Sequence, residues 1–191
     1  SLRRSVLSIS DRSDDGTVWF GTHTGAKHYT IFKWSAVDTS TGLPSDTVTA
    51  VVDYPLRDGR YGTYIGTNSG LYLWYGENQR AIQPMDMPYG LRNSRITALL
   101  HDTTREVVWI GTSGGLYVRR NIVSSPRSHQ DISASWAAVS DVNAPKGPIS
   151  AIEAGGSDSA GGAGDIWIGA GFRVHRLRGN NWQSWDLPYS V

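Results

Sequence analysis

Residues 108–118 read Val108-Trp109-Ile110-Gly111-Thr112-Ser113-Gly114-Gly115-Leu116-Tyr117-Val118. Two short segments of apolar, β-branched and aromatic residues flank a turn of small residues, which is typical of a β-hairpin. Glycine in the turn can adopt the positive φ that a tight hairpin requires. The stretch therefore predicts two antiparallel strands joined by a short turn.

This hairpin pattern occurs four times along the chain. Each copy has an aromatic anchor, then a hydrophobic residue, a glycine, and Thr or Ala. The anchors lie 45, 45 and 58 residues apart, at Trp19, Tyr64, Trp109 and Trp167. A period near 45 residues is that of one propeller blade. A residue that recurs in every repeat has a structural role in the repeat. We therefore expect the anchors to pack between neighbouring blades.

Each unit also carries signals for a first and a fourth strand. Small and β-branched residues at 5–9, 47–51, 95–99 and 148–152 predict innermost strands. Weaker fourth strands are expected near Trp34, Ala81-Ile82, Trp136 and Trp182. The fold class is therefore all-β, a β-propeller of about four four-stranded blades, approximately residues 1–44, 45–92, 93–146 and 147–191. Each blade is one continuous stretch without a latch, so we expect part of a larger ring, for example one of seven blades; a closed four-blade ring is the alternative.

Two insertions interrupt the regular spacing. One is the Gly/Ser/Ala-rich run 155–164, and the other is the segment 124–133. Runs of this composition form flexible turn insertions. We expect both to project from the rim opposite the anchor hairpins.

Composition excludes several classes of protein. The 8 Trp, 9 Tyr and 22 Gly suit many short strands joined by tight turns. With 18 Lys+Arg against 17 Asp+Glu, no basic surface for nucleic acid is indicated. The absence of cysteine excludes disulfides and thiolate metal sites. No apolar stretch is long enough to span a bilayer, so no membrane insertion by this segment is expected.

Residues 42–51 and the hairpin that follows resemble a known repeat. The run Gly42-Leu43-Pro44-Ser45-Asp46-Thr47-Val48-Thr49-Ala50-Val51, with a Trp-Ile-Gly-Thr-x-x-Gly-Leu-Tyr hairpin, is similar to the two-component-regulator propeller repeat. The resemblance covers nearly the whole chain and is strongest around Tyr64 and Trp109. The first unit departs from it with Ala26-Lys27 in place of Leu-Tyr, and the last has Ala170 in place of Thr.

The resemblance implies a biological setting. Repeats of this family typically form the extracytoplasmic sensor region of bacterial hybrid histidine kinases, often with seven blades per ring, and several sense oligosaccharides. An extracellular or periplasmic location is therefore expected, with a protein or an oligosaccharide as partner and further blades of the same parent chain beside these four. The chain itself shows no kinase or DNA-binding segment.

Sequence motifs for metal binding or catalysis are weak or missing. Residues 11–16 resemble a calcium loop, but their spacing is wrong, and a turn explains them better. His23 and His28 lie close in sequence without an identifiable third ligand for a metal. No nucleophile elbow, phosphate loop or zinc-protease motif is present. We therefore expect no catalytic residue, no metal site and no cofactor.

A binding face is easier to derive. The anchor hairpins and the loops that lead into each first strand should emerge on one face. Aromatic rings with amides and charges there suit sugar or peptide recognition, although any one of them could be an ordinary solvated loop residue. The candidate binding residues are His23, Lys27, His28, Asn68, Tyr89, Arg92 and Arg173, with Asp46, Asp86, Lys146, Asp186 and Tyr189 expected on the same face.

Three functions remain open from the sequence. The first is a noncatalytic recognition or sensor module that binds a glycan or a protein. The second is a structural extracellular assembly propeller, which an excess of Arg over Lys and exposed aromatic residues would suit. The third, weakest in signal, is a propeller lyase or hydrolase with catalytic groups collected from several blades.

Overall fold

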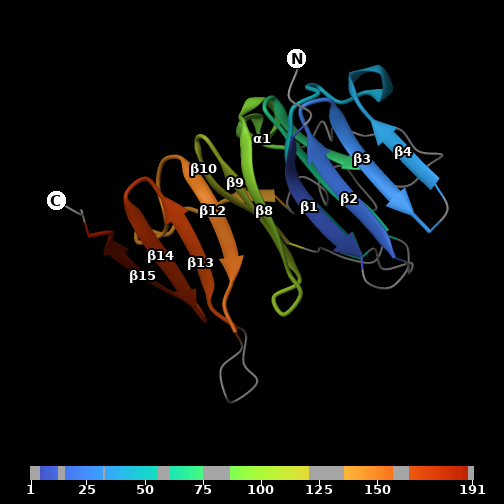
Figure 1. The fold of residues 1–191 in the computed structure, drawn as a ribbon. Helices are drawn as coiled ribbons and strands as arrows, with labels where there is room; N and C mark the ends of the chain where they lie inside the picture. Colours follow the sequence, from blue (N-terminus) through green and yellow to red (C-terminus); the bar gives the residue numbers. More distant parts are fainter. Residues whose placement is uncertain are drawn as a thin grey trace, which may run out of the picture.

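The protein is described by a computed structural model, which covers residues 5–12, 16–31, 33–55, 61–74, 87–120, 136–156 and 164–188. Its strands form four antiparallel sheets, numbered here 1 to 4 in chain order (Figure 1). Sheet 1 contains β1 (Val6–Arg12), β2 (Thr17–Thr22), β3 (Gly25–Thr30) and β4 (Lys33–Val37). Sheet 2 contains β5 (Val48–Pro55), β6 (Tyr61–Thr67) and β7 (Gly70–Trp74). The fourth strand expected near Ala81-Ile82 lies outside the described residues.

The C-terminal half continues the pattern. Sheet 3 contains β8 (Ile96–Asp102), β9 (Val107–Thr112), β10 (Gly115–Arg120) and β11 (Trp136–Ala138). Sheet 4 contains β12 (Ile149–Ala154), β13 (Ile166–Ala170), β14 (Arg173–Arg178) and β15 (Asn181–Asp186). Strands that follow one another in the chain pair within each sheet. Besides the sheets, the described residues contain a 3-10 turn, η1 (Thr39–Thr41), and a short helix, α1 (Tyr89–Asn93).

The four sheets form an open arc. The first strands of neighbouring sheets lie side by side, β1 next to β5, β5 next to β8, and β8 next to β12. Sheets 1 and 4 stand at opposite ends of the arc in Figure 1. The arrangement is propeller-like, and the described residues do not form a closed ring. Both expected insertions, 124–133 and 155–164, lie wholly or mostly outside the described residues.

The threonine of the repeated hairpin closes its turn. Thr67 Oγ1 donates to the carbonyl of Gly70 (2.9 Å), and Thr112 Oγ1 does the same to Gly115 (2.9 Å). The same threonine oxygen accepts a backbone N–H within the turn, from Ser69 in sheet 2. Gly70 has φ +125°, a conformation that side chains disfavour. Local chemistry therefore explains both the Thr and the turn glycine of the motif.

The glycine of the anchor motif has a different role, because it makes room for the next sheet. A Cβ built on Gly66 would stand 2.5 Å from Ile96 Cγ2, and one on Gly111 would stand 2.7 Å from Ile149 Cγ2. At Gly21 the nearest atoms belong to Val48. In β5, β8 and β12 a β-branched side chain thus presses against the glycine of the preceding sheet, and close packing of this kind tolerates no added atom.

All four first strands contain a β-bulge at the same place. The pairing register shifts between Val6 and Ser8, and at the equivalent positions of β5, β8 and β12. A bulge adds one residue to one strand of a pair. Residues three apart, such as Ile149 and Ile152, therefore pack into one cluster against sheet 3. The sequence predicts strands at these positions, and the structure adds a bulge within each of them.

The aromatic anchors pack between sheets, as predicted. Trp19 and Tyr64 are fully buried and Trp109 is nearly so. The fourth-strand tryptophan of the following sheet meets the anchor edge-on: Trp136 lies 6.2 Å from Tyr64, and Trp182 lies 6.3 Å from Trp109, between ring centroids. Trp167, in the last sheet, is only partly buried. Trp19 instead meets Trp74 of the third strand β7 edge-on, at 5.0 Å, so the anchors of sheets 1 to 3 each contact a tryptophan of the following sheet.

Within the described residues, no helix has the length and apolar character needed to cross a membrane.

Candidate functional site

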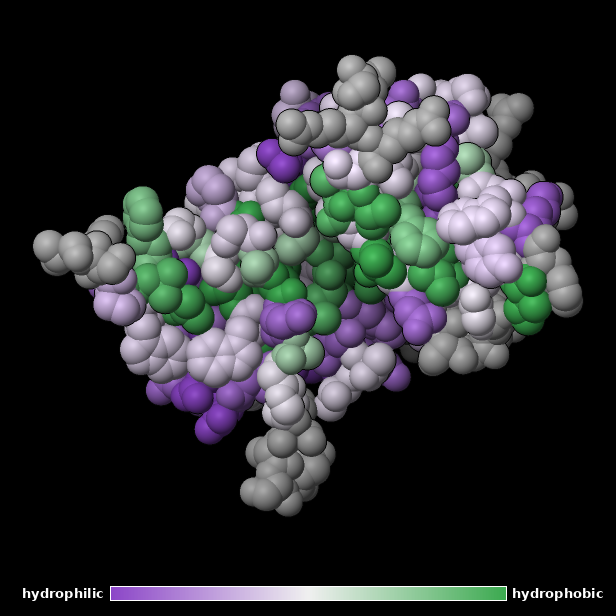
Figure 2. All heavy atoms as spheres, in the orientation of Figure 1, coloured by the Kyte–Doolittle hydropathy of each residue, from purple (hydrophilic) through white to green (hydrophobic). Residues whose placement is uncertain are grey.

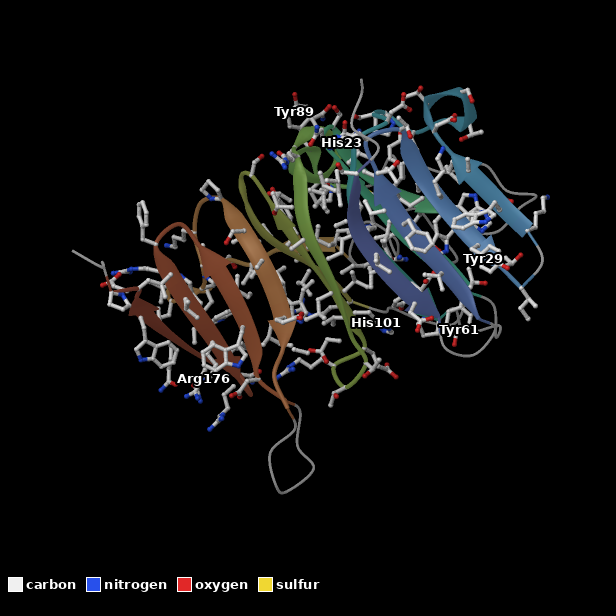
Figure 3. All side chains as sticks on the ribbon, in the orientation of Figure 1. His23, Tyr29, Tyr61, Tyr89, His101 and Arg176 are labelled. Atoms are coloured by element: carbon white, nitrogen blue, oxygen red, sulfur yellow. The ribbon has the colours of Figure 1, made fainter. Side chains whose placement is uncertain are left out.

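Several of the candidate binding residues lie on a rim of loops. We call this the loop rim: the β2–β3, β6–β7, β9–β10 and β13–β14 turns, with the connections that lead into β5, β8 and β12. His23, Asn68 and Tyr89 are exposed there. Figure 3 shows His23 and Tyr89 at the same edge of the arc. Arg92 also belongs to this rim, in α1, and its side chain is partly buried.

His28 does not lie on the loop rim. Its side chain is 3% exposed and stacks on Trp19, with ring centroids 4.3 Å apart and planes 18° apart. The alternation of β3 explains this position, because Ala26 and His28 face sheet 2 whereas Lys27 and Tyr29 face away from it. The expectation that His28 belongs to a surface site is therefore corrected: it is a core residue between sheets 1 and 2.

Lys27 lies apart from the loop rim, and Arg173 flanks the β13–β14 turn of the rim in sheet 4, far from His23 along the arc. Lys27 pairs across the strands with Phe20 on the face of sheet 1 that points away from sheet 2. Arg173 lies at the other end of the arc, where its Nε donates to Asp186 at 2.6 Å. Asp46 is used locally, because its side chain accepts the N–H of Thr39 and its carbonyl accepts that of Gly25. Lys146 is exposed, and Asp86 and Tyr189 lie outside the described residues.

A concave site that the sequence analysis missed lies between sheets 3 and 4. We call it the interblade cleft. Its volume is about 650 Å³, within the range of small-ligand sites. Its lining includes Glu106, Trp109, Arg120, Ala138, Asp141, Asn180 and Trp182.

Small residues and a short strand leave this space open. β11 has three residues, and Ala137 and Ala138 line the cleft on the sheet 3 side. On the sheet 4 side the wall is Leu177 and Trp182, from β14 and β15. The indole rings of Trp109 and Trp182 meet almost perpendicularly, at 88°, so aromatic surface forms part of the lining. The small residues Ala137 and Ala138 and the large aromatic Trp182 are visible in the sequence. Only the packing of sheet 3 against sheet 4 brings them together around the cleft.

A buried carboxylate holds the Trp109 indole. Trp109 Nε1 donates to Asp102 Oδ2 (3.3 Å), and Arg105 Nη1 donates to the same oxygen (2.8 Å). Burial alone would raise the pKa of Asp102. Hydrogen bonds from the Arg105 side chain and backbone and from Trp109 outweigh that effect, and the pKa lies below its ordinary value. Asp102 is therefore charged, and it holds in place the Trp109 ring, which is part of the aromatic lining of the cleft.

Arg105 also connects the two sheets across the cleft. Its Nη2 donates to the carbonyl of Gly164, just before β13, at 3.0 Å. The neighbouring Glu106 has φ +52°, and Gly16 has φ +70° in the corresponding turn of sheet 1. Glu106 therefore adopts the left-handed backbone conformation that Gly16 adopts at the equivalent position of sheet 1. Glu106 and Arg120 add charges of both signs to the cleft.

Metal ligands are not grouped in the described part of the chain, where no cluster of three His, Cys, Asp or Glu side chains occurs.

Comparisons with known proteins show a likeness in fold. No family model and no curated protein matches the chain. The solved extracellular domain of the BT4673 hybrid two-component system of B. thetaiotaomicron is 23% identical, with a TM-score of 0.65, and the match covers 97% of this chain and 22% of that one. A second structure, the extracellular domain of a one-component system BT4673 from the same organism, is 22% identical, with a TM-score of 0.66 and coverage of 100% and 23%. The chain spans less than a quarter of those domains, and it shares their fold over nearly its whole length.

Proposed function

We propose that this chain is part of an extracellular or periplasmic sensor propeller, and that it acts as a noncatalytic recognition module for an oligosaccharide or a protein segment. The likeness in fold to extracellular domains of bacterial signalling systems supports the setting. The observation that carries the recognition role is the interblade cleft, a space of about 650 Å³ with an aromatic wall and a charged edge.

The chemistry of the cleft suits recognition. Indole surface offers an apolar face to a sugar ring or an aliphatic side chain, and Asn180 and the nearby charges can fix orientation through hydrogen bonds. Asp102, which holds the Trp109 indole, has a lowered pKa because Arg105 and Trp109 stabilise its charged form. A carboxylate held in this way positions neighbours, whereas a general acid needs a raised pKa.

The test begins with a ligand screen on the folded chain, using a glycan array and a peptide library, followed by calorimetry on any hit. The double variant Arg120→Ala/Asn180→Ala removes polar groups of the cleft. Asn68→Ala/Tyr89→Ala is the matched variant on the loop rim. We expect at least tenfold weaker binding for the cleft variant and little change for the rim variant.

The opposite pattern would assign the ligand to the loop rim and overturn the cleft as the site. Turnover of a glycan or peptide in the same screen would contradict a noncatalytic role and favour a propeller lyase or hydrolase.

A further inference from the structure

A charged side chain lies among aromatic rings between sheets 2 and 3. The guanidinium carbon of Arg119 is 5.8 Å from the ring centroid of Tyr54, 5.4 Å from that of Tyr64 and 5.0 Å from that of Trp136. We call these four residues the arginine cluster. The sheets otherwise pack mainly through apolar side chains, and Figure 2 shows a band of hydrophobic residues across the middle of the arc.

The strand register explains the position of this arginine. Arg119 pairs with Trp136 on one side and with Val108 on the other, and Val108 pairs in turn with His101. Cross-strand partners share one face of a sheet. Val108 and Trp136 belong to the core between sheets 2 and 3, so the Arg119 side chain points at sheet 2.

Four polar atoms of the arginine cluster have no hydrogen-bond partner in the described structure. They are Nε and Nη1 of Arg119, the hydroxyl oxygen of Tyr64 and Nε1 of Trp136. Tyr64 is 1% exposed and Trp136 is 6% exposed. All these groups can donate a hydrogen bond, and a buried donor without an acceptor is costly. The cluster therefore calls for an acceptor.

No carboxylate on the described strands of sheets 2 and 3 serves as that acceptor. These strands contain two acidic residues, Asp53 in β5 and Asp102 in β8. Asp53 accepts from Ser10 of sheet 1, on the other face of sheet 2. Asp102 accepts from Trp109, on the face of sheet 3 that is turned to sheet 4. Both carboxylates therefore point away from Arg119.

The imidazole beside the cluster does not change this charge balance. His101 meets the ring of Tyr54 edge-on, at 5.1 Å between centroids, and burial lowers its pKa, so it is neutral at neutral pH. Burial also lowers the pKa of Arg119, but a guanidinium stays charged even so. Arg119 thus keeps a positive charge without a counter-ion among the described residues.

We propose that the arginine cluster binds a small monovalent anion of the size of chloride, held by Arg119, the Tyr64 hydroxyl and the Trp136 indole N–H. The anion accepts from these donors and compensates the buried charge. The edges of aromatic rings carry a partial positive charge, which also suits an anion. A divalent oxyanion fits less well, because a single guanidinium leaves half of its charge uncompensated. The bound anion links β6, β10 and β11 and stabilises the interface between sheets 2 and 3.

Urea denaturation at constant ionic strength tests the proposal, with sodium chloride replacing sodium gluconate, whose anion is too large for the cluster. An ion that binds only the folded chain lowers the equilibrium constant for unfolding. We expect a decrease of about tenfold, the value for a chloride concentration about ten times the dissociation constant. Circular dichroism follows the transition without interference from the halide.

Three variants assign the effect to the cluster. Arg119→Leu removes the charge and should abolish the response to chloride, whereas in gluconate it should be at least as stable as the parent. Tyr64→Phe removes only the hydroxyl and should reduce the response by about threefold or more. Arg173→Leu, which removes an exposed arginine paired with Asp186, is the matched control and should keep the full response. An undiminished response in Arg119→Leu would overturn the proposal.

Anomalous diffraction from crystals grown in sodium bromide gives an independent readout, because bromide replaces chloride at such sites. A peak in contact with Arg119 and Tyr64 is expected. A water molecule at that place without an anomalous signal would show that the donors are satisfied by solvent, and the anion site would be wrong.

Discussion

The side chain of Ile149 occupies the space in front of Gly111, at 2.7 Å from where a Cβ would stand. The two residues belong to different sheets, and the same relation holds between Ile96 and Gly66. The glycine of the anchor motif is therefore a requirement of the interface between sheets. This explains why a motif that forms within one hairpin stabilises the array as a whole.

Gly111→Ala should lower the free energy of unfolding by about 1–3 kcal/mol, because Ile149 is buried and cannot retreat. The backbone of Gly111 does not need a positive φ, so the effect isolates the contact. Urea denaturation followed by tryptophan fluorescence measures it. Gly156→Ala, with no atom within 4 Å of the added Cβ, should stay within about 0.5 kcal/mol of the parent. Equal losses in both variants would contradict the contact.

Asp102→Asn should lower stability by about 2 kcal/mol at neutral pH, because a charged acceptor for Arg105 and Trp109 is lost. The pKa of Asp102 is lower in the folded state than in the unfolded chain. Its stabilising contribution is therefore present above the unfolded pKa, and it disappears as the pH falls toward the folded pKa. The difference in the free energy of unfolding between the parent and Asp102→Asn should therefore become smaller at acid pH. Denaturation curves at several pH values test this.

Asp186→Asn is the matched control for that experiment. Asp186 pairs with Arg173 in an exposed ion pair, and pairs of this kind contribute little. The loss of stability caused by Asp102→Asn could also stay constant from neutral to acid pH. That result would show that the Asp102 carboxylate is not the group whose titration changes the stability.

Arg119→Leu should leave the free energy of unfolding unchanged or raise it by about 1 kcal/mol. Burial lowers the pKa of Arg119, which shows an unfavourable environment for its charge, and its Nε and Nη1 have no hydrogen-bond partner in the described structure. Leucine occupies the equivalent place in sheet 4, at Leu177. Arg119→Ala should instead lose about 2 kcal/mol, because it leaves a cavity among the rings. A clear loss in the Leu variant would mean that the cation–π contacts outweigh desolvation.

Thr49→Val should cost about 1 kcal/mol. Thr49 Oγ1 donates to the carbonyl of Ile96 at 2.5 Å, across the interface between sheets 2 and 3. Valine keeps the shape and the β-branched backbone preference and removes only the donor. Thr104→Val, in an exposed turn, should be neutral. Thermal unfolding of the two variants gives the comparison.

Sequence reasoning succeeded where the determinants are local. The hairpin turns follow from Thr67 and Gly70, which interact within three residues of each other. The anchors were expected between blades because they recur, and the burial of Trp19, Tyr64 and Trp109 confirms this. The bulge was missed although the sequence carries its signal: apolar residues three apart, such as Ile149 and Ile152, do not fit a strict period of two.

The candidate site was harder to predict, because it depends on which faces of distant strands meet. His28 has the chemistry of a ligand, and only the register of β3 against β2 shows that its ring packs on Trp19. The interblade cleft needs Ala138 of β11 and Trp182 of β15 to face each other across two sheets. Neither relation can be read from spacing along the chain.

The bulge shared by β1, β5, β8 and β12 also bears on how such an array avoids misassembly. Each of these is an edge strand that lies beside another edge strand, which is the situation in which sheets fuse through their backbone hydrogen bonds. An extra residue at the same place in all four strands interrupts the regular row of donors and acceptors. Neighbouring repeats can then pack through their side chains without pairing their first strands.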